Sequence, residues 1–217
     1  DEKLRAALHM EACMERIRRR KAELGIETDA ENDINKTGMI GPDYSAITTT
    51  LGNIEAKRTS TNPNMAAVIV DMINELGLNP GDKIAINCSG SFPALNLAVM
   101  CAVEETGLVP LLVCSFGAST HGANDPAFTY LDMENYLYNE GQLNHRSDYF
   151  SIGGMEDVGK EMSAEVKAAV VGRLESYGYT LLYDDDLLHN IADRYKLYND
   201  HGDIRCFINV GGNDVSF

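Results

Sequence analysis

The clearest pattern of hydrophobic positions lies between residues 83 and 115. An apolar run beginning at Lys83 follows a cluster of turn residues, which is typical of a buried strand. A segment that is apolar on most sides comes next, with Pro93 at the first helical position and Gly107 where a helix ends. A second continuous apolar run predicts another buried strand, and two such strands joined by a helix indicate a parallel pair. The predicted elements are strand 83–88, helix 94–106 and strand 110–115.

Strand and helix patterns alternate along most of the remaining chain. This alternation predicts a three-layer, Rossmann-like α/β domain with a mostly parallel sheet. We expect the domain to cover residues 38–217, after an N-terminal helical arm and connection in residues 1–37. The charged helix of the arm is interpreted as solvated, with a membrane-surface helix as the alternative. The further predicted elements are helices 2–24, 63–76, 130–138, 164–177 and 187–198, strands 179–183 and 204–210, and loops 117–129 and 146–163.

The overall charge bears on the partners of the protein. The formal net charge is −15, which argues against nucleic-acid binding because phosphate backbones require a basic surface. A polyanionic substrate would need a local basic groove or a metal ion to offset the general repulsion. The hydrophobic share of 44% is ordinary for a globular protein that folds without disulfides. Whether the chain forms a homo-oligomer is left open.

The cysteines are dispersed and show no CxxC spacing. Most of them lie inside apolar runs, so we interpret them as small core residues, with a metal or redox site as the alternative. We therefore expect no metal and no cofactor. An odd number of dispersed cysteines gives no disulfide framework and leaves the redox compartment undecided. The cysteines are Cys13, Cys88, Cys101, Cys114 and Cys206.

Both ends of the sequence are abrupt. It begins with DEKLR, without a starting methionine, and no apolar run is long enough to span a membrane. We expect that a targeting or anchoring segment has been removed. Phe217 follows directly after a strand-like segment and a GGND turn, so we also expect a following C-terminal element to be missing.

The candidate site lies where the predicted strands end. In open α/β sheets, ligands bind beyond the carboxyl ends of the strands, and small polar residues and glycines occupy those positions here. We expect these residues to gather at one edge of the sheet and to bind the substrate. They are Ser89, Gly90, Ser119, Thr120, Asn124, Gly211, Gly212 and Asn213.

Ser91 is the candidate nucleophile because it lies between a predicted strand and the N-terminus of a helix, whose amides would stabilise an oxyanion. The surrounding sequence GSF lacks the second glycine of a nucleophile elbow, and an N-cap or anion-binding serine is the alternative. His121 is the candidate base, with Asp125 or Asp214 orienting it. The alternative for His121 is an exposed loop histidine.

Arg58 is the candidate anchor for a carboxylate. It is followed by Thr59 and Ser60 and precedes the predicted helix 63–76. A guanidinium and hydroxyls at a helix N-terminus are suited to binding a carboxylate or a phosphate. The alternative is that Thr61 or Asn62 simply caps this helix, which would account for the polar residues without a bound ligand.

Four segments of the chain resemble the poly-gamma-glutamate system protein family. They occur in order from about residue 39 to the end: MIGPDYSAITTTLGNIEAKRTSTNPN (39–64), SGSFPALN (89–96), GASTHGANDPAFTYLDME (117–134) and NVGGNDVSF (209–217). Proteins of this family accompany the synthesis and export of poly-γ-glutamate capsules in bacteria. The resemblance implies an extracytoplasmic domain, tethered by an N-terminal membrane anchor and continuing beyond Phe217. It transfers no catalytic residues.

These observations support three hypotheses on function. The first is a serine-type hydrolase or transferase acting on γ-glutamyl bonds, with Ser91, His121 and Arg58 in the roles given above. The second is a non-catalytic module that binds poly-γ-glutamate or γ-glutamyl oligomers. The third is an assembly component that binds proteins of the poly-γ-glutamate synthase complex through helix 2–24.

Overall fold

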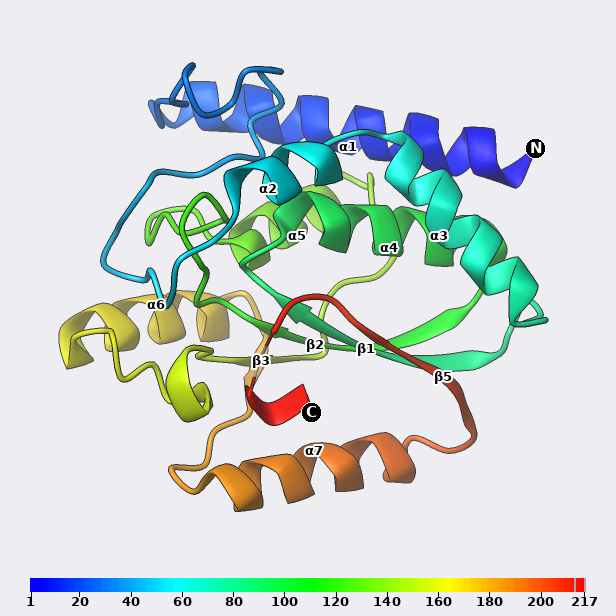
Figure 1. Ribbon diagram of the computed structural model, residues 1–217. Coiled ribbons are helices and arrows are strands. Elements are labelled where there is room, and N and C mark those ends of the chain that lie inside the picture. The colour runs from blue at the N-terminus through cyan, green and yellow to red at the C-terminus, as the bar shows by residue number, and fades with distance from the viewer. Residues whose placement is uncertain (213, 217) are drawn as a thin grey trace.

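The computed structural model describes residues 1–212 and 214–216. Its centre is a five-stranded sheet in the order β4-β3-β2-β1-β5, in which every neighbouring pair is parallel (Figure 1). Helices cover this sheet, so the predicted Rossmann-like α/β architecture is confirmed. The strands are β1 (Lys83–Ser89), β2 (Val109–Ser115), β3 (Tyr149–Ser151), β4 (Thr180–Leu181) and β5 (Ile204–Asn209).

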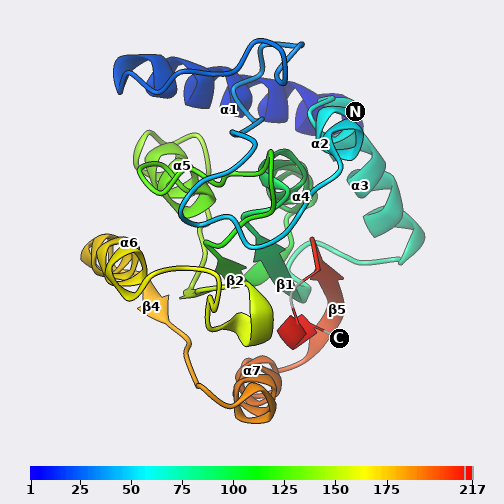
Figure 2. The same cartoon turned by 60° about the vertical axis from the view of Figure 1, so that its left-hand side comes forward.

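The helices form layers on both faces of the sheet. Figure 2, which looks nearly along the sheet, shows α4 and α5 above it and α7 below it, while α6 lies beside β4. The helix α1 forms an outer layer over α4 and also packs against α3. The helices are α1 (Glu2–Glu23), α2 (Ile54–Ser60), α3 (Asn64–Glu75), α4 (Pro93–Thr106), α5 (Tyr130–Asn139), α6 (Ala164–Ser176) and α7 (Leu187–Asp200), with short 3₁₀ turns at Met155–Asp157 and Asp214–Ser216.

The β1-α4-β2 unit has the structure that its sequence predicts. Pro93 is the first residue of α4, and Gly107 ends the helix in the left-handed conformation, with φ 69°. Strands β1 and β2 pair in parallel from Lys83 opposite Val109 to the strand ends. The helix α4 packs between the sheet and the outer helix α1, so it is buried along most of its length.

The N-terminal helix differs from the expected solvated arm. Its side chains Ala6, Met10, Cys13 and Ile17 are fully buried and belong to the same hydrophobic core as α4. These positions recur every three or four residues, so they form one apolar stripe. The charged residues of the helix face outward except Lys21, which is buried and donates to the Gly38 carbonyl. The helix therefore packs as part of the α/β domain. No helix of the described residues is long and apolar enough to cross a membrane.

Two short elements were not predicted from the sequence. The helix α2 lies in a polar segment, where Asn53 caps it by accepting from the amide of Ala56. Strand β3 has only three residues within the expected loop 146–163, and its pairing with β2 is long-range. Neither element carries enough hydrophobic periodicity to identify it, because tertiary contacts determine both.

The topology places a switch point between β1 and β5. The helix α4 leaves β1 over one face of the sheet, whereas α7 leads into β5 across the opposite face (Figure 1). Neighbouring strands whose connecting helices lie on opposite faces leave a crevice beyond their carboxyl ends, where ligands bind in open α/β sheets. The fold thus indicates where to look for a site.

Candidate functional site

A pocket of about 280 Å³ lies beyond the carboxyl ends of the strands. A pocket of this size is at the small end of ligand sites and suits a single residue-sized group. Segments from distant parts of the chain build it, because the loops after β1, β2, β3 and β5 meet at this edge. The residues that line it are Thr49, Thr50, Ser89, Ser91, Gly117, Gly154, Met155, Glu161, Gly212 and Asp214.

Ser91 lies on the turn between β1 and α4, but it does not cap the helix. The N-cap residue of α4 is Phe92, and it makes no side-chain capping bond. The Ser91 Oγ instead accepts hydrogen bonds from the Ser119 amide and from the Ser89 hydroxyl, both at 3.0 Å. Two donors directed at one hydroxyl oxygen favour its deprotonated form, which is the nucleophilic one.

Lys57 of α2 is buried directly behind this turn. Its ammonium donates to the Ser91 carbonyl oxygen and, at 2.6 Å, to the Ser119 Oγ. It also lies 4.4 Å from the centre of the Phe92 ring. Burial lowers the pKa of Lys57 to about 8. Lys57 is therefore a group beside Ser91 that can change its charge close to neutral pH.

No hydrogen bond joins His121 to Ser91 in the described part of the chain. The His121 Nδ1 lies 3.4 Å from a carboxylate oxygen of Asp43 without a hydrogen bond, and its backbone amide donates to Pro42. Asp125 does not orient this ring either, since it accepts from the amide of Ala127. The predicted Ser91–His121–Asp125 arrangement is therefore not formed, because His121, in the left-handed conformation with φ 61°, is held to the connection before α2.

The residues after β5 do reach the pocket. Gly212 and Asp214 line it, and the Asp214 carboxylate accepts from the amide of Glu156 at 2.7 Å. Gly211 has φ 104°, and a Cβ at this position would come within 2.8 Å of the Ser89 Cβ, so the close approach of the two strand ends requires glycine. Asn213 lies outside the described residues.

Several predicted binding residues instead hold the loops together. The Gly90 amide donates to the Ser115 carbonyl, and a Cβ on Gly90 would collide with the Phe116 carbonyl. Thr120 accepts through its Oγ1 from the Gly52 amide. Asn124 is fully buried and donates to Pro42 and Thr48. Apart from the buried Asn124 Oδ1, which has no hydrogen-bond partner among the described residues, the polar groups named here bond within the protein, and none of these residues lines the pocket.

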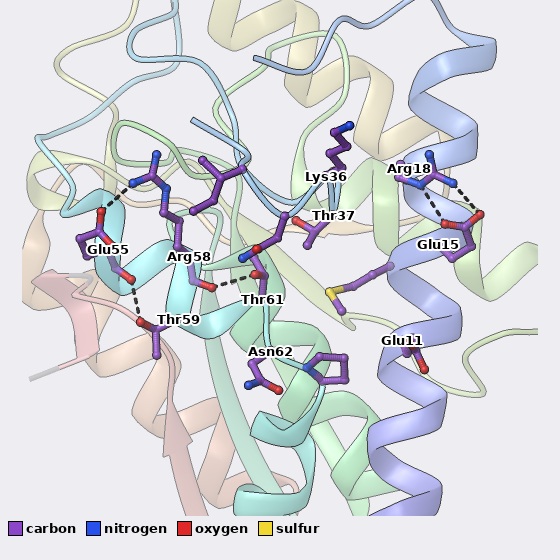
Figure 3. A pocket seen from close by; sticks show the side chains of 14 residues that line it. Glu11, Glu15, Arg18, Lys36, Thr37, Glu55, Arg58, Thr59, Thr61 and Asn62 are labelled. Carbon is purple, nitrogen blue, oxygen red and sulfur yellow. Dashed lines mark hydrogen bonds and ion pairs between the residues drawn. The ribbon is translucent and has the colours of Figure 1, made fainter. Parts of the chain in front are cut away.

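Arg58 lies in a different cavity from Ser91. Figure 3 shows this cavity, of about 780 Å³, between α1, the following connection and α2. The Arg58 guanidinium donates to the carbonyls of Glu31 and Asn32 and pairs with Glu55 at 2.6 Å. Three of its five N–H donors are thus engaged within the protein. Since Arg58 also lies in a different cavity, it does not anchor a carboxylate at the pocket of Ser91.

The neighbours of Arg58 are also engaged. The Thr59 hydroxyl donates to the Glu55 carbonyl, and the Ser60 hydroxyl donates to the Lys57 carbonyl. Thr59 lines the larger cavity with Arg58, whereas Ser60 is buried. These three residues and Ser91 are thus not parts of one site.

The sequence reasoning missed three side chains that matter here. Thr49 and Thr50 line the pocket from the connection before α2, and Lys57 supports it from behind. The TTT run was visible in the sequence, but only the folded connection shows that it reaches the sheet edge. Lys57 and Arg58 are neighbours in the sequence, and both lie on α2. The hydrophobic pattern does not predict this helix, so it could not show which of the two side chains is directed toward Ser91.

The charge at the pocket is negative. Glu161 and Asp214 line it, and none of its lining residues in the described chain is Lys or Arg. The Glu161 carboxylate accepts from the Met155 amide at 3.0 Å. The arrangement offers hydroxyls and a titrating lysine for acyl transfer, and it offers no cation to a free carboxylate.

Comparisons with protein-family models, with curated proteins and with solved structures found no match for this chain.

Proposed function

We propose that this protein is a serine-type hydrolase or transferase that acts on γ-glutamyl bonds, with Ser91 as the nucleophile. The observation that carries the proposal is the position of Ser91, which lines the pocket beyond the strand ends and receives two hydrogen bonds on its Oγ. The topological switch point between β1 and β5 lies at the same edge. The substrate class rests on the resemblance to the poly-gamma-glutamate system proteins alone, because the carboxylates of Glu161 and Asp214 at the pocket would repel the free α-carboxylates of such a polymer.

In the proposed reaction, the Ser91 Oγ attacks the γ-carbonyl carbon of a glutamyl unit and loses its proton. The C–N bond then breaks, the α-amine of the next unit leaves with a proton, and an ester to Ser91 remains. Water or another amine releases the acyl group and regenerates Ser91. Lys57 replaces His121 as the proposed base, because its neutral form can accept the proton and it contacts both Ser91 and Ser119. Transfer to Lys57 requires rotation of the Ser91 or Ser119 side chain.

The proposed setting is the cell envelope. On the strength of the resemblance, we propose that the protein is a membrane-anchored, extracytoplasmic accessory component of poly-γ-glutamate synthesis and export. A non-catalytic role, binding the polymer or proteins of the synthase complex, is the second candidate. It is favoured by the contacts of Ser91, because no carboxylate or imidazole of the described residues hydrogen-bonds to its Oγ.

The test is cleavage of purified poly-γ-glutamate, followed by release of amino groups and by size-exclusion chromatography. We expect Ser91→Ala to reduce the rate by at least about 100-fold, since loss of a nucleophile removes the covalent route. Ser176→Ala, which changes an exposed serine at the end of α6, should cleave at the wild-type rate. Equal rates for Ser91→Ala and the wild type would refute Ser91 as the nucleophile. Saturable binding without any cleavage would favour the second candidate.

The role of Lys57 has a separate test in the pH profile. Since burial lowers the pKa of Lys57 to about 8, the neutral amine becomes more abundant as pH rises, and the rate should increase up to about that pH. Lys57→Arg keeps a cation at the position but cannot supply a neutral base, so it should lose activity by about 100-fold or more. A Lys57→Arg protein with wild-type rate and pH profile would exclude Lys57 as the base.

A further inference from the structure

A group of metal-ligating side chains lies between α1 and α4, apart from the pocket at the strand ends. It consists of His9, Cys13 and Cys101, whose ligand atoms all lie within 4.8 Å of one another. Among the described residues, no other His, Cys, Asp or Glu side chains form such a group. We propose that these three residues bind a Zn²⁺ ion that joins α1 to α4.

The spacing on α1 places two of the ligands on one face of the helix. His9 and Cys13 are four residues apart, so their side chains project from the same side, toward α4. Cys101 approaches from α4, which packs against α1 (Figure 2). Both cysteines are completely buried, whereas His9 is partly exposed, so the group opens to solvent on the histidine side.

The tautomer of His9 is fixed by a neighbouring carbonyl. Its Nε2 lies 2.6 Å from the carbonyl oxygen of Gln142. A carbonyl can only accept a hydrogen bond, so Nε2 donates its proton to it and Nδ1 is the ring nitrogen available to a metal. A backbone carbonyl that holds the second ring nitrogen is the usual outer partner of a histidine that binds zinc.

The three ligand atoms, which lie within 4.8 Å of one another, could bind zinc after moving slightly closer together. In a tetrahedral site with Zn–S bonds of about 2.3 Å, neighbouring sulfur atoms lie roughly 3.8 Å apart. Side-chain movements of about 1 Å or less would therefore bring the three ligand atoms into place. Two thiolates and a neutral imidazole give the bound dication no net charge, which suits a site inside the core. The two thiol protons go to solvent on binding, and water takes the fourth position on the open side.

The contrast with the remaining cysteines supports this reading. Cys88 and Cys114 lie opposite each other on β1 and β2 in the hydrophobic core, and within the part of the chain that the structure describes they belong to no group of three metal-ligating side chains. Cys206 is half-buried on β5 and lies outside the group. The proposal is independent of the reaction proposed above, since neither Ser91 nor Lys57 takes part in it.

The experiment uses the reduced, chelator-treated protein and one equivalent of Co²⁺, followed by displacement with Zn²⁺. We expect the absorption bands of tetrahedral, thiolate-bound cobalt, and their loss on adding zinc. Zinc in about 100-fold excess over its dissociation constant should raise the melting temperature by roughly 5–10 °C. Cys13→Ala and Cys101→Ala should weaken binding by more than the roughly 10- to 100-fold cost of losing an outer partner. Cys206→Ala is the matched control and should bind as the wild type does.

Several outcomes would overturn the proposal. Cobalt bands of equal strength in Cys13→Ala would place the metal elsewhere, and the absence of bands in the folded wild-type protein would exclude a site. A loss of two hydrogen atoms on mild oxidation that Cys13→Ala abolishes, with no metal bound by the reduced protein, would assign Cys13 and Cys101 to a disulfide instead. His9→Ala provides a check that leaves both core cysteines intact, and it should also lose the cobalt spectrum.

Discussion

The two faces of the central sheet are packed by different means. On the α4 face, Ile84, Ile86 and Cys88 of β1 are buried in one hydrophobic core with Leu97 of α4. On the opposite face, the alternate residue Asn87 accepts a hydrogen bond of 2.7 Å from Arg194 of α7. One face is thus held by apolar contacts, and the other is held by a buried polar network.

Arg194 is the centre of that network. Its guanidinium pairs with Asp157 at 2.7 Å and donates to Ser151 at the same distance. Asp157 in turn accepts from Ser151, from the Gly153 amide and from Asn190. Both charged side chains are almost completely buried. Since the network fixes the loop after β3, which contributes Gly154 to the pocket, the polar face helps to shape the candidate site.

The difference shows how each face should respond to substitution. Apolar packing is not directional, and its loss scales with the volume removed. A buried ion pair depends on every partner, because removal of one leaves an uncompensated charge in the interior. The following predictions test this contrast, from the largest expected effect to the smallest.

Removing the cation of the polar face should have the largest effect. Arg194→Ala leaves Asp157 buried without its partner, and we expect a loss of about 3–5 kcal/mol in the free energy of unfolding. Urea unfolding followed by circular dichroism measures it. Arg205→Ala removes an exposed arginine from β5 and should change stability by no more than about 0.5 kcal/mol. Equal losses in the two variants would mean that the network does not hold α7.

Creating a cavity in the apolar face should cost somewhat less. Leu97→Ala removes a fully buried side chain from α4, with an expected loss of about 2–5 kcal/mol. Leu97→Met keeps the volume and should cost less than about 1.5 kcal/mol. The same urea titration is the measurement, and Leu188→Ala, at an exposed position on α7, is the control. A larger loss for Leu97→Ala than for Arg194→Ala would reverse the contrast.

The apolar face contains one acid that should make stability depend on pH. Burial raises the pKa of Glu134 on α5 to about 7, despite hydrogen bonds from Ser147 and Tyr179. The folded protein therefore holds a proton that the unfolded chain releases near pH 4.5, so this contribution to stability falls between about pH 4.5 and 7. The expected decrease is on the order of 3 kcal/mol, since one pKa unit corresponds to about 1.4 kcal/mol.

Melting temperatures measured from pH 4.5 to 8 check this effect. Glu134→Gln cannot ionise, so its stability should change less with pH over this range than that of the wild type. Glu140→Gln alters an exposed carboxylate at the end of the same helix and should keep the wild-type profile. A Glu134→Gln protein with an unchanged profile would show that another group is responsible.

The smallest effect is expected at the surface of the apolar face. Arg5 of α1 pairs with Glu105 of α4 at 2.7 Å, but the Arg5 side chain is more than half exposed. Such pairs contribute about 0–1 kcal/mol, and salt screens them. Arg5→Ala should therefore lower stability by at most about 1 kcal/mol in urea unfolding, and less at high salt. A loss comparable to that of Leu97→Ala would mean that the helix interface depends on this pair.

The parts of the molecule that local sequence patterns determine could be predicted, and the parts that long-range contacts determine could not. The β1-α4-β2 unit was predictable because continuous apolar runs and terminal Pro93 and Gly107 determine it locally. Ser91 and Asp214 could be placed at one pocket because parallel strands share a carboxyl edge. Arg58 and His121 were misplaced because their partners, Glu31 and Asp43 among them, come from a connection whose path no local pattern specifies.

The position of β5 at the edge of the sheet affects how the protein would lose ligand binding on heating. This strand pairs with β1 alone among the described strands, and the residues that follow it line the pocket. An edge strand opens at a lower free energy than the centre of a sheet, so fraying of β5 would dismantle the pocket while the rest of the domain stays folded. On gentle heating, loss of ligand binding should then precede the cooperative melting of the molecule.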